Sequence, residues 1–222
     1  MVLKTVTARK ILATHAKRFL RLNIGLFLYA LGIALTIRAN IGYGPWDSFH
    51  AGLGKTFGIS IGQASIIVGF IIIGATMFMG EKIGLGTILN IVLIGIFLDL
   101  ILWSGVIPLL HNWLAGILLL VSGLFIISVA MVVYMGAAYG AGPRDGLMVA
   151  LSKRIKLPIG VIRGMIELTV TIAGWRLGGM IGLGTLLSAM LLGVFVQLTF
   201  RMCKFDPKAI VHSSLSGLIN PK

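Results

Sequence analysis

The chain has 222 residues, of which 58% are hydrophobic and only 11% are charged, against roughly 25% charged residues in ordinary soluble domains. Its mean hydropathy of +1.04 is typical of a protein that crosses a membrane several times. The formal net charge of +13 would suit a nucleic-acid-binding protein. However, the basic residues lie mostly at the ends of apolar segments, and no soluble basic domain remains. We therefore expect membrane lipid as a partner, and no nucleic acid.

Six segments are long and apolar enough to span a membrane, which takes about 20 residues. These segments are residues 19–37, 61–79, 85–104, 115–136, 159–177 and 183–201. Residues 1–18 form a basic N-terminal segment, which has the composition of an amphipathic helix at the membrane surface. Residues 203–222 form a polar tail. With these spans, fifteen of the 19 Lys and Arg residues fall on the side of the N-terminus, so the positive-inside rule predicts that both termini are cytoplasmic.

The sequence repeats itself after 98 residues without a gap. Gly-Tyr-Gly-Pro-Trp-Asp at 42–47 returns as Gly-Ala-Gly-Pro-Arg-Asp at 140–145, and 24 of the 76 residues from 25 to 100 are identical to the residue 98 positions later. The two membrane units are residues 19–104 and 115–202. Each contains three spans, so the second unit enters the membrane from the opposite side. The prediction is an all-α polytopic protein with six transmembrane helices and an inverted repeat.

Two short segments, 44–58 and 142–156, follow the first span of each unit and begin with Gly-Pro-x-Asp. Pro45 and Pro143 suit the first turn of a helix, and Asp47 and Asp145 follow two residues later, where a carboxylate meets the positive end of the helix dipole. Each segment is too short to span. Two interpretations stay open: surface helices with aspartate caps, or re-entrant helices whose starts bind a solute near the membrane midplane.

Four further residues are candidates for a binding site. Arg163 and Glu167 are four residues apart, on one face of the fifth span, where they can form an ion pair. Charges inside a span usually face the bundle interior or a water-filled cavity. Arg38 and Asn40 end the first span directly before the first Gly-Pro-x-Asp motif. Arg38 suits either anion binding or anchoring at the membrane interface.

Other polar and aromatic residues have simpler explanations. Asp99 falls near the outer end of the third span, where we expect it to be solvated. Trp46, Trp103, Trp113 and Trp175 fall at predicted membrane interfaces, as in an aromatic belt. The glycines of the two Gly-Leu-Gly-Thr segments, at 84–87 and 182–185, are expected to allow close helix packing.

Nothing in the sequence indicates catalysis. There is a single cysteine, Cys203, and the four histidines are scattered, so we expect no metal site. No phosphate-binding loop and no nucleophile–base pair stand out. We therefore expect no cofactor and no enzymatic activity. His50 follows Asp47 by three residues, which is a weak indication of a proton-linked pair.

The motifs resemble a bacterial family of integral membrane proteins, the YczE/YyaS/YitT-like group. The resemblance rests on the opening Arg-Leu-Asn-Ile-Gly-Leu-Phe-Leu-Tyr-Ala-Leu-Gly-Ile-Ala-Leu, on Ala-Asn-Ile-Gly-Tyr-Gly-Pro-Trp-Asp-Ser-Phe-His and on Gly-Ala-Gly-Pro-Arg-Asp-Gly-Leu-Met. It covers roughly residues 20 to 202. The resemblance implies a protein of the bacterial inner (plasma) membrane. It implies no substrate and no functional residues.

The hypothesis that follows is a secondary transporter of a small polar or anionic solute, in which one repeat rocks against the other. Its binding-site residues would be Gly44, Pro45, Asp47, Gly142, Pro143, Asp145, Arg163, Glu167, Arg38 and Asn40. The glycine-rich faces would permit a homodimer. The alternative is a membrane accessory protein that supports a partner complex through its basic cytoplasmic face.

Overall fold

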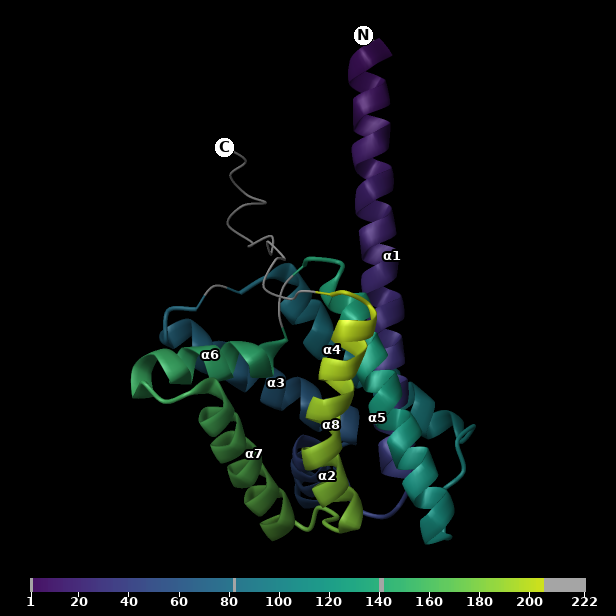
Figure 1. The fold of residues 1–222 in the computed structure, drawn as a ribbon, viewed down its shortest axis with the longest axis vertical. Coiled ribbons are helices and arrows are strands. Elements are labelled where there is room, and N and C mark those ends of the chain that lie inside the picture. Colours follow the sequence, from purple (N-terminus) through teal and green to yellow (C-terminus); the bar gives the residue numbers. More distant parts are fainter. Residues whose placement is uncertain (1, 82, 140–141, 206–222) are drawn as a thin grey trace.

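The structure is a computed structural model that describes residues 2–81, 83–139 and 142–205 (Figure 1). The described residues form eight helices, as the predicted six spans and two short helices require. Their bounds are α1 (Val2–Arg38), α2 (Pro45–Phe57), α3 (Ile61–Phe78), α4 (Leu85–Ser104), α5 (Trp113–Met135), α6 (Pro143–Ile155), α7 (Ile159–Arg176) and α8 (Leu183–Met202). The all-α prediction is therefore confirmed. Most of the predicted tail, residues 206–222, lies outside the described residues.

Five helical segments are long and apolar enough to cross a membrane: Ala16–Arg38 of α1, and all of α3, α4, α5 and α8. The sixth predicted span corresponds to α7, which meets the same test only together with α6, from which it is bent by 118°. Helix α7 is less apolar because it carries Arg163, Glu167 and Arg176. The chain is thus a multi-pass membrane protein with five or six candidate spans.

The basic N-terminal segment is not a separate helix. Helix α1 runs without a break over 37 residues, so the segment continues into the first span and extends beyond the rest of the protein (Figure 1).

The two Gly-Pro-x-Asp segments form helices of 13 residues each, α2 and α6. Proline occupies the first turn of both helices, and the preceding residues, Gly44 and Gly142, have nearly the same backbone angles, with φ of −57° and −63°. Both helices end in the left-handed region, at Gly58 and Lys156. A helix of this length extends over about 20 Å, well short of the roughly 30 Å of a bilayer core.

Helices α1 and α5 make the most extensive contact of any two helices and lie on one side of the bundle in the view of Figure 1. They approach closely because glycines face each other at their crossing. A Cβ atom on Gly32 would lie 2.8 Å from the carbonyl oxygen of Gly123, and one on Gly123 would lie 2.7 Å from that of Gly32. Such small-residue contacts stabilise helix pairs in membranes through van der Waals packing. Helix α4 packs against α1, and α8 packs against α5.

The short helices cross between the two halves of the chain. Helix α2 packs on α7 and α3, while α6 packs on α3 and α7. The connections before them are also paired across the halves. The backbone N–H of Gly184 donates to the carbonyl of Ile41 over 2.7 Å, and that of Gly86 donates to the carbonyl of Tyr139 over 2.9 Å. The N–H of Tyr43 donates to Met180 over 3.0 Å.

Asp99 is not a solvated helix end. Its carboxylate is half-buried and accepts hydrogen bonds from the Ser60 hydroxyl and from the backbone N–H of Gly62, the latter over 2.8 Å. These bonds tie the C-terminal part of α4 to the first turn of α3. The expectation that Asp99 is solvated was therefore wrong.

We predict that Gly32→Ala destabilises the protein, because the added methyl group would collide with α5. Overpacking of this kind typically costs about 1–3 kcal/mol. The control is Gly74→Ala in α3, where a Cβ would meet no atom within 4 Å, so helix propensity should stabilise it by up to about 1 kcal/mol. Thermal unfolding in detergent measures both variants, and equal melting temperatures would contradict the close α1–α5 contact.

Candidate functional site

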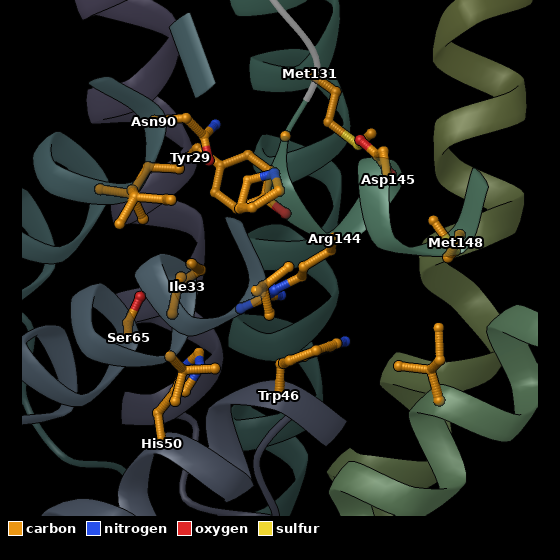
Figure 2. Close-up of a pocket in the computed structure, with 18 of the residues that line it drawn as sticks. Tyr29, Ile33, Trp46, His50, Ser65, Asn90, Met131, Arg144, Asp145 and Met148 are labelled. Carbon is orange, nitrogen blue, oxygen red and sulfur yellow. The ribbon is translucent and has the colours of Figure 1, made fainter. Parts of the chain in front are cut away.

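A cavity of about 150 Å³ lies between the two halves of the protein, and all eight helices contribute residues to it (Figure 2). A cavity of this volume holds a ligand the size of benzene. Its lining contains, beside apolar side chains, the polar or aromatic residues Tyr29, Trp46, His50, Ser65, Asn90, Tyr134, Arg144, Asp145, Arg163 and Glu167. It is the obvious candidate site, since binding sites combine apolar walls with a few convergent polar groups.

Trp46 and Arg144 meet in this cavity. They are the variable residues of the two Gly-Pro-x-Asp motifs, and the Arg144 guanidinium carbon lies 4.6 Å from the centre of the Trp46 ring, a cation–π contact. The structure thus places Trp46 inside the protein and not in the predicted aromatic belt. Trp103, Trp113 and Trp175 are exposed, as the belt prediction requires.

The two arginines of the cavity differ in their partners. Arg163 donates from Nε to Glu167 over 2.8 Å, so the predicted ion pair is confirmed. Arg144 forms no ion pair with a carboxylate of the described residues. Its guanidinium, apart from the stacking on Trp46, is directed into the cavity (Figure 2). The site therefore offers a positive charge whose guanidinium donates no hydrogen bond to another of the described residues.

Polar groups gather around the start of α6. A Cβ atom on Gly142 would lie 3.4 Å from a carboxylate oxygen of Asp145, 3.6 Å from the Tyr134 hydroxyl and 4.0 Å from the Asn90 side-chain oxygen. Gly142, Pro143 and Asp145 all line the cavity. Because the first N–H groups of a helix have no partner within it, this end is suited to bind an acceptor atom of a solute.

The start of α2 is built in a similar way but is more enclosed. A carboxylate oxygen of Asp47 would lie 3.1 Å from a Cβ on Gly44, and the Cβ of Ser188 would lie 3.9 Å away. The Ser188 hydroxyl is buried without a hydrogen-bond partner in the part of the chain that the structure describes. Among the described residues, no side chain forms a capping hydrogen bond at the start of α2 or α6. Unlike their counterparts in α6, Gly44, Pro45 and Asp47 do not line the cavity.

The other two candidate residues lie elsewhere. Arg38 donates from Nη2 to the carbonyl of Leu102 over 2.5 Å, and Asn40 donates to the carbonyl of Leu110 over 3.0 Å. Both side chains therefore hold the connection between α4 and α5. Neither lines the cavity.

His50 is almost fully buried, with 2% of its surface exposed, and it lines the cavity next to Trp46. His50 therefore belongs to the lining of the cavity. Asp47, which the spacing suggested as its proton-linked partner, does not line the cavity.

Sequence reasoning did not select Trp46 and Arg144 as site residues, nor Tyr29, Asn90 and Tyr134. Trp46 was expected in the aromatic belt, and Arg144 was not among the candidate residues. One indication was available: residues at equivalent positions of two related units become neighbours when they lie near the axis that relates the units. Trp46 and Arg144 are such equivalent positions.

Comparison with known proteins shows the family. A model of a family of unknown function, DUF6198, matches residues 16–201. The uncharacterized membrane protein YczE of Bacillus subtilis (strain 168) is 38% identical over 175 residues, which cover 78% of this chain and 80% of that protein. YyaS of the same organism is 28% identical over 193 residues, covering 83% of this chain and 94% of that protein.

An uncharacterized protein of Haemophilus influenzae is 31% identical over 180 residues, which cover 79% of this chain and 82% of that protein. No solved structure matches. The chain belongs to the DUF6198 family of membrane proteins, and the resemblance to YczE and YyaS is confirmed.

We predict a measurable coupling between Trp46 and Arg144. In a double-mutant cycle with Trp46→Leu and Arg144→Gln, the coupling energy should be about 0.5–2 kcal/mol, as for a partly desolvated cation–π pair. The measurement is the free energy of unfolding of the four proteins in detergent. A matched cycle with Trp175→Leu and Arg144→Gln should be additive, because Trp175 is exposed at the end of α7. Equal coupling in both cycles would contradict the contact.

Proposed function

We propose that the protein is a secondary transporter of a small anionic or zwitterionic solute, which binds in the cavity between the starts of α2 and α6. The observation that carries this proposal is Arg144: a guanidinium that forms no ion pair with any carboxylate of the described residues and is directed into a cavity that all eight helices line. Charges within membrane segments are costly, and they usually mark a substrate or ion pathway.

The size of the cavity restricts the solute. A volume of about 150 Å³ suits a molecule of roughly six non-hydrogen atoms, since an engineered cavity of this size binds benzene. Arg144 would bind a carboxylate or a similar planar anion through two parallel hydrogen bonds. The start of α6 and the Tyr134 hydroxyl would bind further acceptor atoms. Asp145 lines the same cavity and would favour a solute that also carries a positive group.

An inverted repeat of the two halves supports transport. Helices α2, α3 and α4 contain 13, 18 and 20 residues, and so do α6, α7 and α8. Each of these helices in the second half begins and ends 98 residues after its counterpart. The cap angles before α2 and α6 also agree. Inverted repeats of this kind are a frequent basis of alternating access, with the substrate bound between the repeats.

Reciprocal contacts also support the repeat. Ile41 accepts from Gly184, and Tyr139, which is 98 residues after Ile41, accepts from Gly86, which is 98 residues before Gly184. In one bond the first half supplies the acceptor and the second half the donor, and in the other bond the equivalent residues do the reverse. A two-fold relation between the halves produces such a reciprocal pair of bonds. For units with an odd number of spans, we infer that this axis lies in the membrane plane, which would place the starts of α2 and α6 near the midplane.

The transport prediction is tested with purified protein in liposomes. The probes are radiolabelled acetate, lactate, glycine, alanine and ethylammonium, each small enough for the cavity. We expect uptake of at least one probe with a carboxylate, and its loss in Arg144→Gln. Arg176→Gln is the matched control, because Arg176 is an exposed cation outside the cavity lining. The same probe should raise the melting temperature of the parent and not that of Arg144→Gln.

Two further variants separate the roles of the motif aspartates. Asp145→Asn changes a residue of the cavity lining, so it should alter uptake. Asp47→Asn should change stability more than uptake, since Asp47 does not line the cavity. If no probe with a carboxylate binds or is taken up, and the protein is instead recovered with a partner complex, the accessory role replaces the transporter.

We infer that both termini are cytoplasmic, because the basic residues concentrate on that side. Cys203 tests the orientation, since it is the single cysteine of the sequence and its side chain is exposed. A membrane-impermeant thiol reagent should not label right-side-out vesicles until detergent opens them. Equal labelling of sealed vesicles would place the C-terminal end of α8 outside.

A further inference from the structure

We propose that the protein has a second conformation in which α7 closes on α8 in the way that α3 is already closed on α4, while α3 and α4 separate. This inference rests on the repeat in the proposed function, and it specifies which helices form the moving barrier. In the present structure the cavity would be accessible between α7 and α8, and in the second conformation between α3 and α4.

Helices α3 and α4 are tightly packed in the present structure. A Cβ atom on Gly95 would lie 2.7 Å from the carbonyl oxygen of Gly62, and one on Gly62 would collide with Gly95 and with the carboxylate of Asp99. Further along, a Cβ on Gly69 would lie 2.7 Å from the Ile91 side chain. Three glycines thus let the two helices touch along their length.

The equivalent helices α7 and α8 barely touch, although both line the cavity. Gly160 and Gly193 are the counterparts of Gly62 and Gly95, 98 residues later. A Cβ atom on either of them, or on Gly164, would meet no described atom within 4 Å. The second half therefore keeps the same glycines without the contact that they make in the first half.

The uncontacted faces of α7 and α8 remain complementary in size. Where the first half packs Gly69 against Ile91, the second half has Glu167 and Ala189 at the equivalent positions. In the first half the larger residue of the pair is Ile91 on α4, and in the second half it is Glu167 on α7. Each pair therefore combines one large and one small side chain, so the helices can still fit together. Closure would bury Glu167 with its charge paired, because it already binds Arg163.

The hydrogen bonds that hold α3 on α4 have no equivalent among the described residues of the second half. Ser60 and Asp99 correspond to Pro158 and Gln197. Proline has no side-chain donor, and Gln197 is exposed. Closure of α7 on α8 therefore lacks the hydroxyl–carboxylate bond and has only a neutral acceptor, the Gln197 amide oxygen, for the backbone N–H of Gly160, whereas closure of α3 on α4 has both bonds to the Asp99 carboxylate. This difference explains why the protein rests with α3 and α4 closed, and removal of the Asp99 charge should favour the second conformation.

The test is a disulfide between α7 and α8 in native membranes. In a Cys203→Ser background, Gly160→Cys is combined with Gln197→Cys, the counterparts of Gly62 and Asp99, which are in contact. We expect an intramolecular disulfide to form on mild oxidation, and to form several-fold faster when Asp99→Asn is added. The control pair is Gly160→Cys with Leu198→Cys, which occupies a different face of α8 and should form several-fold less.

The proposal is wrong if the 160–197 pair forms no more disulfide than the control pair, or if the bond joins two copies of the chain, as the mass on a non-reducing gel reveals. Variants that carry only one of the two introduced cysteines can form a disulfide only between two copies of the chain, so they show how much of that product arises. The result does not depend on a solute. If the disulfide forms but no probe is transported, the second conformation is supported and the proposed transport function is rejected. If a probe is taken up but the disulfide does not form, transport is supported and closure of α7 on α8 is excluded as the moving barrier.

Discussion

The pairing of the non-helical backbone before α2 and α6 is the constraint on which the rest of the structure depends. Away from water, each unpaired N–H or carbonyl group costs several kcal/mol, so such a segment persists only where other groups of the protein bind it. Here the carbonyls of Ile41 and Tyr139 accept bonds from the starts of α8 and α4. These bonds fix where both short helices begin.

Glycine makes this pairing sterically possible. Gly42 has a φ of 115°, and a Cβ at this position would lie 2.6 Å from the backbone nitrogen of Gly182. Gly86 likewise lies against the backbone of Tyr139. The conformation and the close approach both exclude larger residues, so the Gly-Leu-Gly-Thr segments serve as partners for the connections before the short helices. Once these starts are fixed, Trp46 and Arg144 are brought face to face.

Hydropathy and helix-start rules were sufficient for most of the fold. They predicted both short helices and six spans, of which five are long and apolar enough on their own, because these elements depend on local composition and on proline at the first turn. They failed for Asp99, since its hydrogen bonds to Ser60 and Gly62 join residues that lie far apart in the sequence. The i,i+4 spacing predicted the Arg163–Glu167 pair correctly, because both partners lie on one helix.

The cavity was harder to predict for a related reason. Its main contact joins two residues, Trp46 and Arg144, that differ between the copies. A comparison of the copies ranks residues by identity, so it selected the invariant Pro and Asp of each motif. Trp46 and Arg144 contact each other and need complementary chemistry, an aromatic ring and a cation, so identity between the copies could not select them. At this position, the difference between the copies was therefore more informative than their identity.

The simplest alternative explanation of the cavity is a packing defect. The charged residues in the lining of the cavity argue against that explanation. Empty cavities in proteins are apolar, because a polar lining without partners is costly. This lining contains Arg144, for which the described residues supply no carboxylate partner. If the cavity served only packing, replacing Arg144 by an apolar residue would remove a half-buried charge and stabilise the protein. A residue that costs stability at the meeting point of all eight helices is instead characteristic of a site that must bind something.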